Sequence, residues 1–244
     1  MTDTRNGAAW AIVRQVVIGA ESIDATSKEL RDAFGLAEGF ADPLLEEMGL
    51  ADETIRVGSE AHLEVVAAIR DDASIAGWIA KGGGGGGYAL SIQVPDIAPL
   101  LAAAEADGVR AVADVEAYGH RIVQLHPGDM GLLVELDEIA DPAAWFWDDI
   151  TTEEPAAPVI DDILAVDLSS SDPVAQARRW ATVFGVEVGS VEGVPQIVLG
   201  TRTLRFVEGP RRFLSAVEVA VVPGREVERT ELEISGVRFT LTAR

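Results

Sequence analysis

Apolar and polar residues alternate in short runs along the first 140 residues, and between some runs the apolar spacing changes to that of a helix. Residues 11–19 (AIVRQVVIG) alternate and are rich in β-branched side chains, which predicts a strand. Residues 22–35 begin with Ser22, keep apolar residues at helical spacing and end at Gly35, which predicts a helix. We expect two more strands at 53–59 and 61–69, joined by a tight Gly-Ser turn, and a short helix at 71–80.

The same order returns after a run of six glycines at 82–87. A strand at 88–94 (YALSIQV) precedes a helix at 96–109, and strands are expected at 110–117, 120–127 and 130–138. Both segments therefore follow a β-α-β-β pattern, which indicates an internal repeat of about 50–60 residues. A phosphate-binding glycine loop leads into the N-terminus of a helix, whereas these glycines lead into a strand. We interpret them as a hinge or crossover between two copies of the repeat.

The second half repeats the pattern in a shorter form. A third copy has a strand at 162–170, a helix at 172–185 and strands at 186–191, 195–200 and 203–209. A fourth begins with a strand at 213–222 but lacks a helix. The sequence thus predicts an α+β fold of tandem modules, four in two pairs, with the last degenerate. The expected boundaries are 8–148 for the first pair, 149–159 for a linker rich in proline and acidic residues, and 160–244 for the second.

Composition narrows the classes of function. The chain of 244 residues contains no cysteine, which excludes disulfides and thiolate metal sites and fits a cytoplasmic location. Its net charge of −22 would repel nucleic acid and anionic lipid over most of the surface. No run approaches the roughly 20 apolar residues of a membrane span. We therefore expect a small organic ligand as the partner, and neither nucleic acid nor a membrane.

Four segments resemble the vicinal oxygen chelate superfamily, which includes glyoxalases, bleomycin-resistance proteins and dihydroxybiphenyl dioxygenases. VRQVVIGAESIDATSKELRDAFGL, IRVGSEAHLEVVAAI, GGGYALSIQVPDI and VQLHPGDMGLLVELDE occur in the order of the paired modules of that superfamily, most like its glyoxalase-like branch. The resemblance covers residues 11–147 and implies that two modules curl their sheets into a cup that holds the substrate. It also implies a homodimer as one assembly, although paired modules within one chain already build a complete cup.

The resemblance also implies where metal ligands would lie. Active members supply one ligand from the first and one from the last strand of each module, and here these positions hold Gln15, Glu64, Ala89 and Glu135. Two carboxylates remain, one amide is available and one position has no donor. His62 lies two residues before Glu64, so on a strand both share a face and His62 could supply the missing imidazole, or it could meet solvent at the strand end. We expect no metal, or a divalent ion held weakly by Glu64, Glu135 and His62.

The function that the resemblance implies is a glyoxalase-like enzyme of the isomerase or lyase type, which transfers a proton next to a carbonyl group. Glu64 or Glu135 would act as acid or base, and His126 would assist. The polar side chains expected to position the substrate lie on the first strands of the two modules and are Arg14, Gln15, Ser91 and Gln93.

Two other functions fit the same cup. A binding or sequestering protein of the drug-resistance type needs no metal, and a cup lined mainly by aromatic residues would favour it over catalysis. A protein that serves only assembly would fill the cup with its own side chains.

Overall fold

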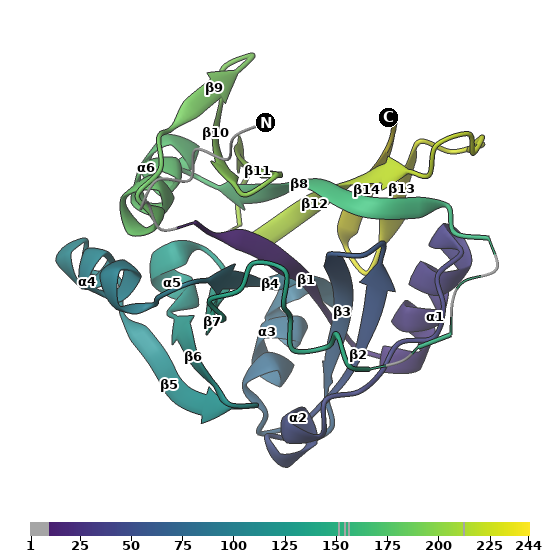
Figure 1. The fold of residues 1–244 in the computed structure, drawn as a ribbon, viewed down its shortest axis with the longest axis horizontal. Coiled ribbons are helices and arrows are strands. Elements are labelled where there is room, and N and C mark those ends of the chain that lie inside the picture. The colour runs from purple at the N-terminus through teal and green to yellow at the C-terminus, as the bar shows by residue number, and fades with distance from the viewer. Residues whose placement is uncertain (1–9, 151, 154, 156, 212) are drawn as a thin grey trace.

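The described strands join into one continuous mixed sheet with helices on both of its faces (Figure 1). The computed structural model describes residues 10–150, 152–153, 155, 157–211 and 213–244. The elements of the first half are β1 (Ile12–Ala20), α1 (Ile23–Phe34), α2 (Pro43–Glu47), β2 (Leu50–Val57), β3 (Ala61–Ala68), α3 (Ser74–Gly82), β4 (Gly85–Val94), α4 (Ala98–Ala106), β5 (Ala111–Ala117), β6 (His120–Leu125), α5 (Pro127–Met130) and β7 (Leu133–Glu138). Those of the second half are β8 (Ile160–Ser170), α6 (Pro173–Phe184), β9 (Gly189–Val191), β10 (Val194–Leu199), β11 (Arg202–Glu208), β12 (Phe213–Val221), β13 (Glu231–Ile234) and β14 (Val237–Ala243).

Each module places its first and last strands side by side and parallel. In the first module β1 pairs with β3 and β2 pairs with β3, while a single bridge between Phe40 and Thr54 stands for a fourth strand. In the second module β4 pairs with β7, and β6 and β5 extend the sheet. Antiparallel pairing of β1 with β4 joins the two modules.

The second half repeats this arrangement, with β8 parallel to β11 and β12 parallel to β14. The chain passes from β12 to β13 without a helix, so the fourth module is the shortened one. The α+β fold of four modules in two pairs is therefore confirmed. The boundaries at 8–148, 149–159 and 160–244 stay a prediction, and residues 8, 9, 151, 154 and 156 lie outside the described part of the chain.

The glycine tract lies where the two halves meet. The left-handed φ of 82° at Gly83 ends α3, and β4 begins two residues later. Gly87 pairs with Leu214 of β12, and a Cβ at Gly87 would lie 2.3 Å from the carbonyl oxygen of Leu214. The tract therefore allows β4 to approach the second half more closely than a residue with a side chain would.

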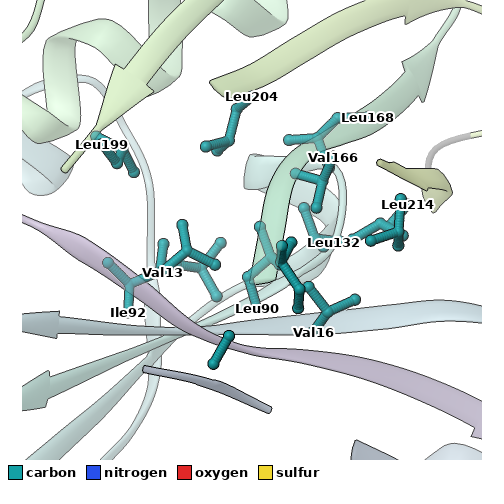
Figure 2. Packing of buried hydrophobic residues seen from close by; sticks show 14 of the residues in the cluster. Val13, Val16, Leu90, Ile92, Leu132, Val166, Leu168, Leu199, Leu204 and Leu214 are labelled. Carbon is teal, nitrogen blue, oxygen red and sulfur yellow. The ribbon is translucent and has the colours of Figure 1, made fainter. Parts of the chain in front are cut away.

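Both halves share one hydrophobic core. Figure 2 shows Val13, Val16 and Leu90 of β1 and β4 pointing toward Val166 and Leu168 of β8, and all of these side chains are buried. Alternation along the strands then turns the opposite face of β1 and β4 away from this core, toward the concave side of the first half. None of the helices in the described part of the chain is long and apolar enough to cross a membrane.

A β-bulge in β1 decides which of its side chains reach that concave face. Between the pairs Val13–Ile92 and Gln15–Ser91, β1 contains one extra residue, Arg14. Val13 therefore faces the core and Gln15 the concave side, although strict alternation would place both on one face.

Candidate functional site

A cavity of about 130 Å³ lies on the concave face of the first pair of modules. Its walls come from strands β1–β4, β6 and β7, and the lining is completed by α2, the end of β5 with the β5–β6 turn, and residues 146–147, which we call its mouth. An engineered cavity of about 150 Å³ in another protein holds one benzene molecule, so this one encloses a group of roughly six non-hydrogen atoms.

Strand register brings four of the expected site residues to this cavity. Gln15 of β1 pairs with Ser91 of β4, which pairs with Glu135 of β7. Glu64 of β3 pairs with Val17 of β1, one alternation further along the same face. Gln15, Glu64, Ser91 and Glu135 all line the cavity.

The carboxyl group of Glu64 is hydrogen-bonded through only one of its two oxygens among the described residues. Its Oε2 accepts a hydrogen bond of 2.6 Å from Nε2 of Gln15, whose Oε1 accepts one of 2.8 Å from the indole of Trp147. Because the indole N–H can only donate, Trp147 fixes the amide so that its nitrogen faces Glu64. Burial raises the pKa of Glu64 well above its ordinary value, and the nearby Asp52 and Glu135 raise it further.

Asp52 is a cavity residue that the sequence analysis did not identify. It lies on β2, is only 6% exposed, and accepts the backbone N–H of Asp42 at 2.9 and 3.1 Å. Burial is the main cause that raises its pKa to about 7, and the Asp42 carboxylate adds to the effect. The signal was present in the pattern, because Asp52 and Thr54 share a face of β2 and Thr54 pairs with Glu64.

Glu135 and Asp137 form a second pair of buried carboxyl groups. Gln124 donates a hydrogen bond of 2.8 Å to its Oε2, and Ser91 donates one of 2.5 Å to Asp137, which is completely buried. Burial raises the pKa of both Glu135 and Asp137. The cavity therefore has carboxyl groups with raised pKa on both of its sides.

Aromatic side chains form much of the mouth, and residues 145–147 (WFW) were not expected there. Trp147 and Phe146 line the cavity, and the Tyr118 ring packs edge-on against Trp147 with centroids 5.3 Å apart. Arg56 holds this segment by donating to the carbonyl oxygens of Trp147 and Ile150. The tyrosine hydroxyl also donates to the Asp42 carboxylate at the start of α2, so α2 and the β5–β6 turn close the mouth together.

Arg14 and Gln93 are buried but do not line the cavity. Nε of Arg14 donates to Oε1 of Gln93 at 2.7 Å, and its NH2 group donates to the carbonyl of Pro142 at 2.6 Å. The guanidinium also lies 5.7 Å from the ring centroid of Trp145. The structure thus places these two residues under the segment that follows β7 and not in contact with a cavity ligand, because the bulge at Arg14 turns its side chain away.

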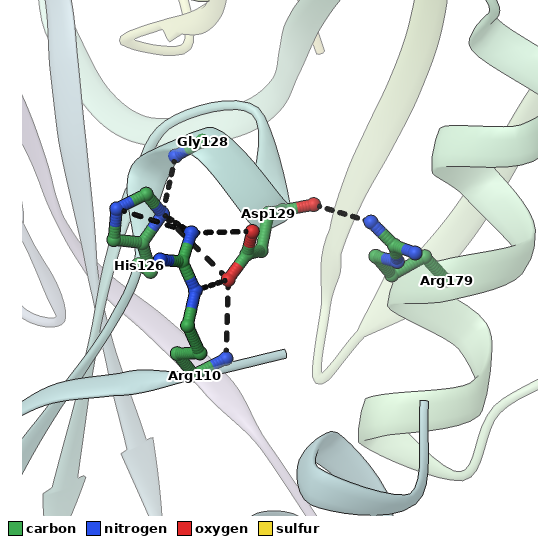
Figure 3. Close-up of polar contacts among 5 residues, drawn as sticks. All are labelled: Arg110, His126, Gly128, Asp129 and Arg179. Atoms are coloured by element: carbon green, nitrogen blue, oxygen red, sulfur yellow. Dashed lines mark hydrogen bonds and ion pairs between the residues drawn. The ribbon is translucent and has the colours of Figure 1, made fainter. Parts of the chain in front are cut away.

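His126 does not line the cavity and lies at the start of α5 (Figure 3). Its Nδ1 accepts the backbone N–H of Gly128 at 3.0 Å, and the guanidinium of Arg110 lies beside the ring. Arg110 pairs with Asp129 through contacts of 2.8 and 2.9 Å, and Arg179 of α6 donates to the carbonyl of Asp129. This network fixes α5 against α6, so the structure does not bring His126 to Glu64 or Glu135.

His62 shares the face of Glu64 but lies outside the cavity lining. It is buried, not exposed at a strand end, and neither ring nitrogen has a hydrogen-bond partner within the described residues. Burial and the neighbouring guanidiniums of Arg56, Arg14 and Arg202 lower its pKa to about 3, although the Arg14 carbonyl lies near enough to oppose them slightly. The imidazole is therefore neutral at physiological pH.

The four positions that hold metal ligands in active superfamily members do not fit a metal here. The described residues contain no group of three His, Cys, Asp or Glu side chains placed to hold an ion. The amide oxygen of Gln15 is bound by Trp147, and Ala89 offers no donor atom. We therefore derive no chemistry through a metal at these positions.

Charged side chains on β8, β11 and β12 of the second pair form ion pairs with one another. Arg205 lies between Asp167 and Glu218, with contacts of 2.6 and 2.7 Å, and Thr242 donates to Glu218 at 2.8 Å. These charged side chains of the second pair therefore bind one another.

Comparison with known proteins agrees with this architecture. Mitochondrial methylmalonyl-CoA epimerase of Mus musculus is 26% identical over 135 residues, which are 53% of this chain and 75% of that protein. A 4-hydroxymandelate synthase mutant from Streptomyces coelicolor has the same fold, with a TM-score of 0.66, 15% identity, and coverage of 87% of this chain and 71% of that chain. The predicted resemblance to the vicinal oxygen chelate superfamily is confirmed.

A second solved structure shows how far this superfamily fold extends along the chain. A hypothetical protein from Staphylococcus aureus matches 96% of this chain and 100% of its own with a TM-score of 0.68, at 11% identity. This likeness concerns the fold alone. No protein-family model matches the chain.

Proposed function

We propose that this vicinal oxygen chelate protein is an isomerase that moves a proton at the carbon next to a carbonyl group of a small organic ligand. The observation that carries the proposal is the pair Asp52 and Glu64. Both line the small cavity from adjacent strands, and both have a raised pKa. A general acid or base works best when its pKa lies near the working pH, as that of Asp52 does.

Like charges in one buried site ionise one after the other, so at neutral pH one carboxyl can be ionised while its neighbour keeps its proton. The ionised group would remove a proton from the carbon, and the protonated group would return one. The Gln15–Trp147 hydrogen bonds hold Glu64 in one orientation, which limits the geometry from which it can act. The similarity to methylmalonyl-CoA epimerase, an isomerase by name, supports the same class of reaction.

The test is deuterium exchange at the carbon next to a ketone, followed by proton NMR in D₂O with hydroxyacetone as the probe. The wild-type protein should accelerate exchange above the buffer rate. Glu64→Gln and Asp52→Asn should each lower the accelerated rate by about 100-fold or more, since a positioned acid or base contributes at least that factor. Glu105→Gln is a matched control, because Glu105 is exposed on α4 and does not line the cavity.

Equal exchange rates in the wild type and in Glu64→Gln, with both folded by circular dichroism, would refute the role of the carboxyl pair.

The second candidate is a non-catalytic binding protein, and the aromatic residues at the mouth favour it. However, pockets for drug-sized ligands occupy roughly 300–1,000 Å³, well above the volume enclosed here. Ligand binding without exchange of any probe would favour this candidate over the isomerase.

A further inference from the structure

The ionisable side chains that line the cavity, apart from tyrosines, are all acidic. Its lining contains four carboxyl groups, from Asp42, Asp52, Glu64 and Glu135, and the described residues contribute no lysine, arginine or histidine to it. Arg14 of β1 and Arg56 of β2 do not line the cavity, because Arg14 binds Gln93 and Arg56 binds backbone carbonyls. An anionic ligand would therefore enter a site with no positive group to receive it.

The Glu64 carboxyl in this lining has one oxygen without a hydrogen-bond partner among the described residues. Glu64 is only 8% exposed, and while its Oε2 is bound by Gln15, its Oε1 has no hydrogen bond among the described residues. This oxygen keeps some exposure inside the cavity, so a donor on the ligand could reach and satisfy it. A positively charged donor would also offset the repulsion that Asp52 and Glu135 exert on Glu64.

The remaining walls suit a positive charge as well. Tyr88, Tyr118, Phe146 and Trp147 line the same cavity. The faces of aromatic rings carry partial negative charge and attract ammonium groups, so carboxylates and aromatic rings together form a typical environment for an organic cation.

We infer that the cavity selects a small carbonyl compound bearing a protonated amino group over neutral and anionic compounds of the same size. The carbonyl part of this inference rests on the proposed isomerase function, whereas the ammonium part rests on the lining itself. The inferred ligand of this chain is a cation, and it therefore differs in charge from a methylmalonyl group, which carries a carboxylate.

Three ketones of similar size test the inference: aminoacetone is a cation, hydroxyacetone is neutral and pyruvate is an anion at pH 7. We would measure their dissociation constants by NMR titration of the ¹⁵N-labelled protein at constant ionic strength. Aminoacetone should bind at least about tenfold more tightly than hydroxyacetone, and pyruvate most weakly. Glu64→Gln should reduce the preference for aminoacetone, and Glu105→Gln should leave it intact.

Equal affinities for aminoacetone and hydroxyacetone, or tighter binding of pyruvate, would overturn the inference. Displacement of aminoacetone by an equal concentration of Mg²⁺ alone would also overturn it, because the site would then recognise metal ions and not the ammonium group. Deuterium exchange measured on the same samples keeps the two proposals apart. Glu64-dependent exchange of all three ketones without a charge preference would leave the isomerase standing, whereas preferential binding of aminoacetone without exchange would leave only the charge selectivity.

Discussion

Replacing Asp52 with asparagine should stabilise the protein, and more so as the pH rises. In the folded chain burial and the neighbouring carboxylates hold the pKa of Asp52 at about 7, compared with an ordinary value of 3.8. Folding therefore forces a carboxyl group to keep a proton that the unfolded chain would release. Asparagine keeps an oxygen that can accept the Asp42 N–H but has no charge to bury.

The size of the effect follows from the linkage between protons and folding. Between pH 3.8 and about 7 the unfolded chain binds fewer protons at this position than the folded chain, so the free energy of unfolding falls as pH rises. Each pH unit in this window contributes about 1.4 kcal/mol. From pH 5.5 to pH 7 the wild type should lose about 2 kcal/mol that Asp52→Asn does not lose, and above pH 7 the difference should stay constant.

Urea denaturation followed by tryptophan fluorescence at pH 5.5 and pH 8 measures this difference. Both conditions lie above the sequence isoelectric point of about 4.3, where precipitation would interfere. Asp71→Asn is the matched control, since Asp71 is exposed after β3. The reasoning would be refuted if the difference in free energy of unfolding between Asp52→Asn and the wild type were the same at both pH values. A difference that decreased as pH rose would show a pH dependence of the opposite sign.

Two further predictions concern the junction of the halves and the mouth of the cavity. Gly87→Ala should lower the free energy of unfolding by about 1–3 kcal/mol in urea denaturation, because its Cβ would press on the Leu214 carbonyl. The control Gly77→Ala in α3, where a Cβ would have nothing within 4 Å, should be neutral or stabilising. Equal losses of stability for both variants would contradict this prediction. Tyr118→Phe removes the hydroxyl that binds Asp42. It should speed amide hydrogen exchange in α2 and lower the free energy of unfolding by less than about 1 kcal/mol. Unchanged amide exchange in α2 would show that this hydrogen bond does not close the mouth.

Most of the fold could be predicted because its signals are local. Alternation in 11–19 and 88–94, the stop at Gly35 and the repeated order of elements depend only on nearby residues, and the structure has strands β1 and β4 and helix α1 at these places. The superfamily assignment followed from the same order. Gln15, Glu64 and Glu135 were expected at the site because of the resemblance, and Ser91 because it lies on the first strand of the second module; all four line the cavity.

The rest of the site depends on contacts between distant residues. A bulge at Arg14 cannot be read from β1 alone, since it exists only in the register between β1 and β4. Trp147 reaches Gln15 from 132 residues away, and this contact follows from the path of the chain after β7. Asp52 was overlooked for another reason: a single aspartate in a strand is ordinary until the opposite strand is known to present Glu64.

The position of β4 has a consequence for how a ligand reaches the site. This strand pairs with β1, β7 and β12, and its core face packs against the second half. A passage through the back of the cavity would have to part three strand pairings and expose the shared core at once. We therefore expect a ligand to enter from the opposite side, past α2 and the Tyr118 hydroxyl that binds its N-terminal Asp42, so that the exchange rate between bound and free ligand depends on α2 more than on the sheet.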